Sequence, residues 1–376
     1  MIISRTPFRL SFFGGGSDYP EWYLKNGGQV LSTTIDKYCY LTLRYLPPFF
    51  EHNIRVVYSK IETVKKFNEI QHPLIRETLR HLNFNQNVEI HHDGDLPARS
   101  GMGSSSSFTV GFLNALNALN GKISDKMDLA TTAMHIEQNL VGDTVGSQDQ
   151  TAAAFGGLNK IVFNKNGLIE VKPLTISMDR IRSLNDNLML FYTGIMRTAS
   201  NIAKNYIVDM EKKEKCIHKM SEMVDEAVDI ISSGQNLDAF GKLMDTNWNA
   251  KKSIAQDISN NYIDNYYQRA KAAGAIGGKI TGAGGGGFLM FYVPKERQEQ
   301  VREALCDLIH IPFNFEFNGS QIIFYDSQTD DFRHIYDERE CRDFNGFVEL
   351  KSLKLQSVKK DETINHEQYA NVTPQP

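Results

Sequence analysis

The sequence predicts an α+β fold in about two domains. Its 376 residues exceed the usual size of one domain, and 41% of them are hydrophobic, enough for a sizeable core. Strand-like and helix-like patterns occur in both halves of the chain, with glycine-rich stretches between them. We therefore expect an N-terminal domain over 1–185, a C-terminal domain over 186–340, and an extension with a flexible tail over 341–376.

The first half contains β-branched and aromatic runs bounded by turn-forming residues, followed by helical patterns. Strands are expected over Ile2–Phe13, Gln29–Tyr45 and Asn87–His92. Helices are expected directly after Ser107, over Asp125–Leu140 and over Thr151–Phe155. Two glycines at 156 and 157 end the last of these helices.

The second half mixes long amphipathic helices with short strands. Helices are expected over Ala199–Ser232, Leu237–Ile258 and Lys295–Leu308. Strands are expected over Asn187–Tyr192, Phe288–Val293 and near Asn314–Phe324, where they would complete the second half. Beyond Asp326 the chain becomes polar, and we expect residues 351–376 to be a mobile tail.

Composition excludes several classes of function. The formal net charge is −4 and Lys and Glu are interleaved, so no basic stripe for nucleic acid is present. The start of the chain lacks a signal-peptide pattern, and no apolar run reaches the ~20 residues of a membrane span. The four cysteines are scattered without a CxxC pair, which argues against a zinc site or a disulfide framework. We expect a cytoplasmic protein that binds a small molecule; its oligomeric state is not predicted.

A loop of small residues, Pro97 to Ser107, runs directly into a helical pattern. Gly101 and Gly103 let the backbone approach an anion, and the N–H groups and positive dipole end of the following helix point at it. A structural loop and helix cap of similar composition is an equally good interpretation of this segment alone. The phosphate-binding interpretation assigns a nucleotide to Pro97, Arg99, Ser100, Gly101, Met102, Gly103, Ser104, Ser105 and Ser106.

Three glycine-containing motifs follow one another along the chain: Thr6 to Tyr19, Pro97 to Ser107, and Thr281 to Gly287. Each could individually be a flexible turn. In this order they resemble the GHMP kinase superfamily, which contains the galactokinase, homoserine, mevalonate and phosphomevalonate kinases. No Lys follows Gly103, so the loop differs from the G-x-x-x-x-G-K-[ST] loop of other nucleotide-binding proteins. The resemblance implies a two-domain GHMP kinase fold with ATP on the second motif and the active site in the interdomain cleft.

The resemblance also implies the catalytic residues. Asp149 lies in a Gly-x-x-Asp-Gln segment similar to the one that carries the catalytic base of galactokinase-like members. Arg9 matches the arginine of the first motif that lies near that base, where its charge keeps Asp149 ionised and offsets developing negative charge. In isolation, Asp149 would be interpreted as a carboxylate stabilising the start of a helix, and Arg9 as a surface residue of an edge strand.

Magnesium is expected because it bridges phosphate oxygens during phosphoryl transfer. The resemblance makes Ser105 the first choice of hydroxyl ligand, with Ser104 or Ser106 as alternatives. Glu137 is the matching carboxylate, twelve positions before Asp149, one more than in the mevalonate kinase pattern. An exposed helical glutamate is the other interpretation of Glu137.

The first motif departs from that of galactokinase, which reads Gly-Glu-His-Thr-Asp-Tyr. Here the corresponding Glu and His are Gly15 and Gly16, while Asp18 is retained as a candidate acceptor for a sugar hydroxyl. Loss of the carboxylate opens space for a bulkier or anionic substituent. This pattern is similar to that of the bacterial D-glycero-D-manno-heptose 7-phosphate kinases and, less closely, to that of fucokinase domains.

This second resemblance extends to the segment from Phe191 to Ser200, in which Arg197 is either a partner of a substrate phosphate or a surface residue at a helix start. We also place Gly284 and Gly285 on the substrate-binding side. The sequence thus predicts an ATP-dependent kinase for the anomeric hydroxyl of a sugar phosphate, for nucleotide-activated heptose and surface polysaccharide synthesis. The alternatives are a kinase of an unphosphorylated sugar, a superfamily decarboxylase, and a non-catalytic nucleotide-dependent binding protein.

Overall fold

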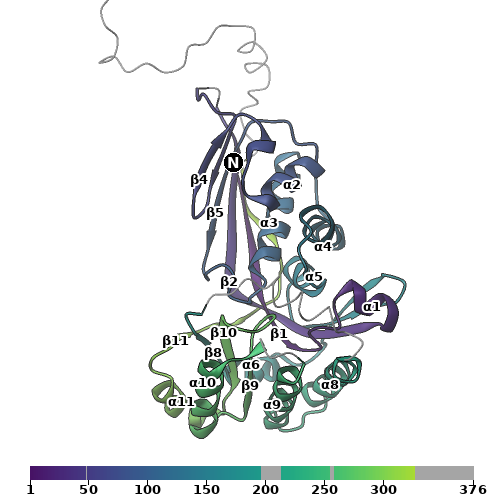
Figure 1. Cartoon of the computed structure of the whole chain (residues 1–376), viewed down its shortest axis with the longest axis vertical. Coiled ribbons are helices and arrows are strands. Elements are labelled where there is room, and N and C mark those ends of the chain that lie inside the picture. The colour runs from purple at the N-terminus through teal and green to yellow at the C-terminus, as the bar shows by residue number, and fades with distance from the viewer. Residues whose placement is uncertain (48, 196–212, 255–257, 327–376) are drawn as a thin grey trace, which may run out of the picture.

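The computed structural model describes residues 1–47, 49–195, 213–254 and 258–326. Within these residues the strands form a nine-stranded sheet and a four-stranded sheet. Figure 1 shows an elongated molecule with the large sheet in its upper part and the small sheet with its helices in its lower part. The pattern of two mixed units that the sequence predicts is therefore present.

The large sheet is built on two long antiparallel strands, β1 (Ile2–Phe13) and β2 (Gly28–Tyr45). The other strands of the N-terminal half are β3 (Ile54–Val57), β4 (Ile61–Val64), β5 (Val88–Gly94), β6 (Asn159–Phe163) and β7 (Ile169–Pro173). The pairing of β1 with β2 shifts register between Pro7 and Phe8. Proline lacks an N–H for the ladder, and such bulges re-aim the side chains that follow. Arg9 is the second residue after this shift.

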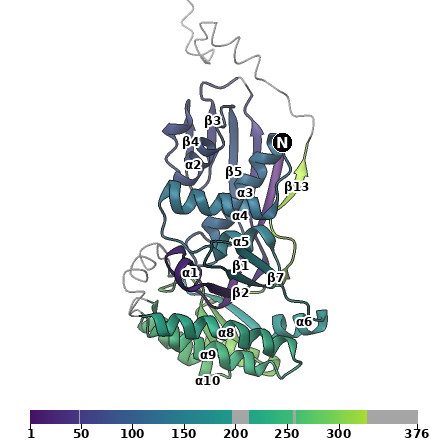
Figure 2. The same ribbon diagram turned by 90° about the vertical axis from the view of Figure 1, so that its right-hand side faces the viewer.

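Helices cover one face of the large sheet (Figures 1 and 2). They are α2 (Pro73–His81), α3 (Ser104–Leu119), α4 (Lys126–Met134), a π-helix (His135–Val141) and α5 (Gln148–Phe155). The three helices predicted in this region are confirmed, with the expected Asp125–Leu140 divided between α4 and the π-helix. The sequence analysis missed α2, the short α1 (Pro20–Asn26) and a 3₁₀ turn (Phe67–Glu69).

The small sheet has the antiparallel order β11-β8-β10-β9. Its strands are β8 (Leu188–Tyr192), β9 (Gly277–Ile280), β10 (Phe288–Tyr292) and β11 (Ile309–Ile311). The accompanying helices are α6 (Met178–Asp186), α8 (Glu214–Ser232), α9 (Asp238–Lys252), α10 (Asn261–Ala272) and α11 (Gln298–Ala304), with a 3₁₀ turn at Lys295–Arg297. The first part of the predicted helix Ala199–Ser232 lies outside the described residues.

Strands occur near Asn314–Phe324 as predicted, but the expectation that they complete the second half is wrong. Strand β12 (Phe315–Glu316) pairs with β2, and β13 (Gln321–Tyr325) pairs antiparallel with β1. Strand β13 covers the side of β1 that faces away from β2, and an open strand edge there would bind another strand readily. The chain therefore returns to the N-terminal sheet before the predicted tail, 341–376, which lies outside the described residues.

The end of β1 lies against the helices of the C-terminal half. Phe12 and Phe13 are fully buried, and both make edge-to-face contacts with Phe240 of α9, at ring distances of 5.4 and 5.2 Å. Such aromatic pairs add to the burial of apolar area. This packing holds the strand that carries the first motif between the two halves of the molecule.

Candidate active site

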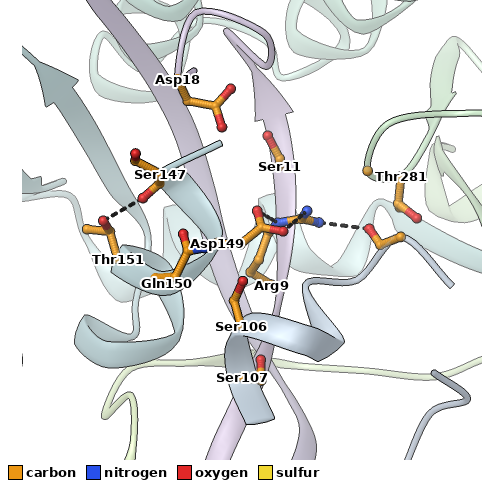
Figure 3. A network of polar contacts seen from close by, with 12 residues as sticks. Arg9, Ser11, Asp18, Ser106, Ser107, Ser147, Asp149, Gln150, Thr151 and Thr281 are labelled. Atoms are coloured by element: carbon orange, nitrogen blue, oxygen red, sulfur yellow. Dashed lines mark hydrogen bonds and ion pairs between the residues drawn. The ribbon is translucent and has the colours of Figure 1, made fainter. Parts of the chain in front are cut away.

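The side chain of Arg9 joins the first two motifs. It is 3% exposed, and its Nε and Nη2 donate to Oδ1 and Oδ2 of Asp149 at 2.6 and 2.7 Å. Its Nη1 donates to the carbonyl oxygen of Gly101 at 2.8 Å, and its backbone N–H donates to Met102. Figure 3 shows this pair at the centre of the polar network. Arg9 is thus a buried partner of the phosphate loop and of Asp149, not a surface residue.

Asp149 lies in the first turn of α5, so it also occupies the position where a carboxylate stabilises a helix start. Two parallel hydrogen bonds from a guanidinium fix the plane of its carboxylate. Its side chain remains 24% exposed, against 4% for Arg9. The carboxylate is therefore oriented by a buried cation and still accessible to a ligand.

The glycines of the phosphate loop meet a steric need. Gly103 is the N-cap of α3 with φ 74°, and a Cβ there would lie 3.2 Å from Cγ of Arg9 and 3.4 Å from Oδ2 of Asp149. Gly101 has φ 78°, and its Cβ would lie 2.6 Å from the carbonyl oxygen of Thr281. A side chain is therefore strained at both positions and would clash with the backbone of Thr281 at Gly101, and the start of α3 lies beside the Arg9–Asp149 pair.

The remaining loop residues differ in exposure. Pro97 and Arg99 are exposed, and Arg99 has φ 60° and donates its N–H to Oγ of Ser104 at 3.4 Å. Met102 and Ser100 are buried, and Oγ of Ser100 has no hydrogen-bond partner among the described residues. The loop thus combines an exposed rim with a buried base.

The serines at the start of α3 point in different directions, as the helical period requires. Ser105 is exposed, whereas Ser106 is buried and donates to Oε2 of Glu137 at 3.0 Å. Ser107 donates to the carbonyl oxygen of Pro7 at 2.9 Å. The alternative hydroxyl ligand, Ser106, is therefore the one hydrogen-bonded to Glu137, whereas Ser105, the first choice, faces solvent.

Glu137 is fully buried in the π-helix, which rules out an exposed helical glutamate. Its Oε2 accepts from Ser106 and from Nε2 of Gln150, at 3.0 and 2.8 Å, whereas Oε1 has no partner among the described residues. Burial raises the pKa of Glu137 to about 7, although the hydrogen bonds from Ser106 and Gln150 lower it. A buried carboxylate oxygen without a protein partner is a position that an ion or a water molecule can occupy.

A carboxylate and a hydroxyl fit Mg²⁺, which prefers oxygen ligands and takes the rest from phosphates and water. The described residues contain no group of three His, Cys, Asp or Glu side chains that could hold a metal alone. The donor set at Glu137 and Ser106 therefore fits a metal that arrives with a nucleotide better than a permanently bound one.

The first motif places a second carboxylate near the pair. Asp18 is 2% exposed, and its Oδ1 accepts from the N–H of Gly16 at 2.8 Å. Burial raises the pKa of Asp18, and the negative charge of Asp149 raises it further, whereas the Gly16 hydrogen bond lowers it. A Cβ at Gly146 would lie 1.9 Å from Oδ2 of Asp18. A side chain at Gly146 would therefore displace the carboxylate of Asp18.

Gly15 and Gly16 differ in backbone conformation. Gly16 has φ 106°, a conformation that other residues rarely adopt. Gly15 is not among the glycines of positive φ, and a Cβ there would lie 3.8 Å from Nε2 of Gln148 and 3.9 Å from Oγ of Ser11. Glycine at position 15 is therefore not a backbone requirement, and it leaves space between Ser11 and Gln148.

The third motif contacts the second through its first residues. A Cβ at Gly282 would lie 2.7 Å from Cα of Gly101, and Thr281 Oγ1 donates to Ser100 at 3.4 Å. Gly284 and Gly285 instead pack against the backbone of Ile258. Arg197 lies outside the described residues.

Two buried lysines at this site were missed by the sequence analysis. Lys251 donates to the carbonyl oxygen of Gly282 at 2.6 Å, and Lys279 donates to those of Ser11 and Phe12 at 2.8 and 3.0 Å. Burial lowers the pKa of Lys251 to about 8 and that of Lys279 well below its usual range. Lysines in helical runs are usually solvated, so the residue type of Lys251 gave no signal. The position of Lys279, two residues before the third motif, could have given one.

Both halves of the chain match known family models. Residues 68–157 match the family described as GHMP kinases N terminal domain, and residues 214–310 match GHMP kinases C terminal. The chain belongs to the GHMP kinases. This GHMP kinase is a phosphotransferase of the sugar-kinase type, and members of the family use ATP. In the part of the chain that the structure describes, no helix is long and apolar enough to cross a membrane.

Several relatives of this GHMP kinase are named for sugar substrates. It is 29% identical over 319 residues to a D-glycero-alpha-D-manno-heptose 7-phosphate kinase of Campylobacter jejuni, covering 81% of this chain and 93% of the relative. It is 26% identical to an L-fucokinase/L-fucose-1-P guanylyltransferase of Bacteroides fragilis, covering 80% of this chain and 35% of that protein. A crystal structure of a D-glycero-D-manno-heptose 1-phosphate kinase from Bacteroides thetaiotaomicron matches with a TM-score of 0.70 and 25% identity, covering 87% of this chain and 100% of that one.

Proposed function

We propose that this GHMP kinase transfers the terminal phosphoryl group of ATP to the anomeric hydroxyl of a sugar phosphate. The acceptor is D-glycero-D-manno-heptose 7-phosphate and the product its 1,7-bisphosphate, an intermediate for nucleotide-activated heptose and surface polysaccharide. The name of the Campylobacter jejuni relative and the space at Gly15 support this acceptor.

The observation that carries the proposal is the bidentate contact of Arg9 with Asp149 beside the N-terminus of α3. Asp149 accepts the proton of the acceptor hydroxyl, the acceptor oxygen forms a bond to the terminal phosphorus, and the bond to the departing ADP breaks. Arg9 orients the base and offsets negative charge on the group in transfer. The phosphate loop holds the nucleotide with backbone N–H groups.

Glu137 and Ser106 would hold Mg²⁺, whose chemistry is to bridge phosphate oxygens and neutralise their charge. Asp18 accepts a hydrogen bond from a sugar hydroxyl, from a position beside Ser147 and within electrostatic reach of Asp149. The two carboxylates near the acceptor therefore have separate tasks. Asp149 moves a proton, and Asp18 fixes the orientation of the sugar.

The test is ATP consumption by the purified protein with Mg²⁺ against parallel panels of free sugars and sugar phosphates. Phosphorus NMR then gives the position of the new phosphate. We expect turnover of the heptose 7-phosphate with phosphate added at the anomeric oxygen. A new phosphate at any other position, or no reaction with any sugar phosphate, would overturn the proposal.

A kinase of an unphosphorylated sugar is the second candidate. The observation that favours it is the match to the fucokinase of Bacteroides fragilis over 80% of this chain. Activity on a free sugar alone would select this candidate and retain the role of Asp149. Nucleotide binding without turnover in either panel would instead indicate a nucleotide-dependent binding protein.

A further inference from the structure

Lys251 is a buried cation with few partners. It lies near the end of α9, is 8% exposed, and its Nζ donates to one acceptor, the carbonyl oxygen of Gly282 at 2.6 Å. Among the described residues no carboxylate lies within ion-pair distance of this Nζ. An ammonium group carries three N–H donors, so the protein hydrogen bonds leave two of them unused. Such a group is costly to bury unless a ligand completes it.

Other incompletely bonded polar groups surround the same end of β1. Asn247 lies one helical turn before Lys251 on α9 and is 2% exposed; its Nδ2 donates to Phe12 at 3.3 Å, but its Oδ1 has no partner among the described residues. Ser11, 4% exposed, has an Oγ that is likewise without a partner there. Residues four apart share a helix face, so Asn247 and Lys251 project from the same side of α9.

Lys251 lies where the second and third motifs meet. Its acceptor Gly282 packs on Gly101, and the carbonyl oxygen of Gly101 accepts from Arg9. After burial, the charge of Arg9 is the next largest influence that lowers the pKa of Lys251, while Asp18 and Asp149 raise it. The ammonium is thus within electrostatic reach of the catalytic pair although it comes from the C-terminal half.

We propose that Lys251 binds a phosphate group in the active site. A phosphate dianion supplies the anionic oxygens that the ammonium lacks in the protein. Two phosphates could provide this chemistry: the phosphoryl group in transfer, and the phosphate that the acceptor already carries. This inference rests on the proposed kinase function and adds a residue of the other half of the molecule to that site.

The test compares Lys251→Met and Lys251→Arg with Lys252→Met. Lys252 is the matched control, because it follows Lys251 on α9 but pairs with Asp264 at 3.4 Å and lies over the ring of Trp248. The first readout is the rise in melting temperature on adding inorganic phosphate, which needs no turnover. We expect phosphate to stabilise the wild type and Lys252→Met, and to stabilise Lys251→Met much less. Equal stabilisation of all three proteins, or none of the wild type, overturns the proposal.

The second readout is steady-state kinetics with the sugar phosphate and its unphosphorylated counterpart. A charge-assisted hydrogen bond corresponds to about a 10- to 100-fold effect. If Lys251 binds the group in transfer, Lys251→Met lowers kcat for both acceptors by this factor. If it binds the acceptor's own phosphate, the KM of the sugar phosphate rises by this factor and the free sugar is unaffected.

Lys251→Arg separates binding from structure, because arginine keeps the charge. If Lys251→Arg restores a large part of the phosphate stabilisation and of the kinetics that Lys251→Met loses, phosphate binding is supported. A loss that is equal in Lys251→Arg and Lys251→Met, accompanied by a lower melting temperature without phosphate, would mean that Lys251 only ties α9 to Gly282, and would overturn the proposal. If the wild type phosphorylates no sugar phosphate, the proposed acceptor fails while the phosphate-stabilisation test still decides the role of Lys251.

Discussion

The Arg9–Asp149 side and the acceptor side of the active site differ in how completely their polar groups are satisfied. On the Arg9–Asp149 side, the guanidinium of Arg9 donates to both oxygens of Asp149 and to the carbonyl oxygen of Gly101. On the acceptor side, Oγ of Ser11, Oε1 of Gln148 and Oδ1 of Asn247 are buried without partners among the described residues. Preorganised groups need no rearrangement when charge develops, whereas unpaired buried groups indicate where a ligand completes the structure. The difference suggests that the first side does the chemistry and the second selects the acceptor.

The largest effect is expected where the satisfied side is broken. Asp149→Ala should lower kcat by ~10²–10⁴ while ATP binding stays nearly intact, because a general base is lost and the loop is not. Rapid-quench kinetics and calorimetric ATP titration measure the two quantities. Asp128→Ala is the control, since Asp128 is an exposed carboxylate in the first turn of α4. Near-normal turnover of Asp149→Ala would leave Asp149 only a helix-stabilising role.

Gly103→Val should weaken ATP binding by about 10-fold or more. The residue has φ 74°, and its Cβ would lie 3.2 Å from Cγ of Arg9. A left-handed conformation costs other residues about 1–2 kcal/mol, and the new side chain also blocks the approach of phosphate. Gly121→Val isolates the conformational cost, because Gly121 has φ 70° with no atom within 4 Å of its Cβ. An unchanged dissociation constant for ATP in Gly103→Val would refute the assignment of the loop.

Glu137 makes the stability of the protein depend on pH. Its pKa is raised from 4.5 to about 7, so the metal-free protein gains stability from neutral Glu137 at low pH and loses it as the pH rises through about 7. Glu137→Gln keeps the neutral form, and should be more stable than the wild type at pH 8 by on the order of 1–3 kcal/mol.

Urea unfolding between pH 5 and 8.5 in a chelator measures this difference, with the exposed Glu222→Gln as control. A stability difference between Glu137→Gln and the wild type that does not grow with pH would contradict the buried, uncharged state of Glu137. In the same experiment Mg²⁺ with ADP should stabilise the wild type and not Glu137→Gln.

The smallest effect is expected at Gly15. A Cβ there has ordinary contacts, at 3.8 Å from Gln148 and 3.9 Å from Ser11, so Gly15→Ala should change stability by no more than about 0.5 kcal/mol. It should raise the KM of the acceptor by a few-fold, roughly 1 kcal/mol, because the methyl group occupies space on the acceptor side. Gly14→Ala, whose Cβ would lie 2.0 Å from a backbone oxygen, should instead impair folding. An unchanged KM in Gly15→Ala would show that this space is not used by the acceptor.

Which glycines lie at the active site and which pack elsewhere could not be predicted from the sequence. The second and third motifs are both glycine-rich, yet Gly103 faces the Arg9–Asp149 pair while Gly284 packs against Ile258. The resemblance made Ser105 the first choice of hydroxyl ligand over Ser104 and Ser106, and the sequence could not test that choice, because neighbouring serines on a helix are equivalent until another element covers one of them. Here the π-helix carrying Glu137 covers Ser106.

The sequence by itself determined the local features of this protein. The three motifs, the helix that begins after the phosphate loop, and the candidate residues Arg9, Asp149 and Glu137 depend on residue types at short spacing, and a resemblance can be recognised from them. Only the tertiary structure decided which distant segments meet. The return of β13 to β1, the burial of Lys251 beside Gly282 and the partner of Glu137 depend on packing between elements far apart in the chain, where local pattern carries no information about contact.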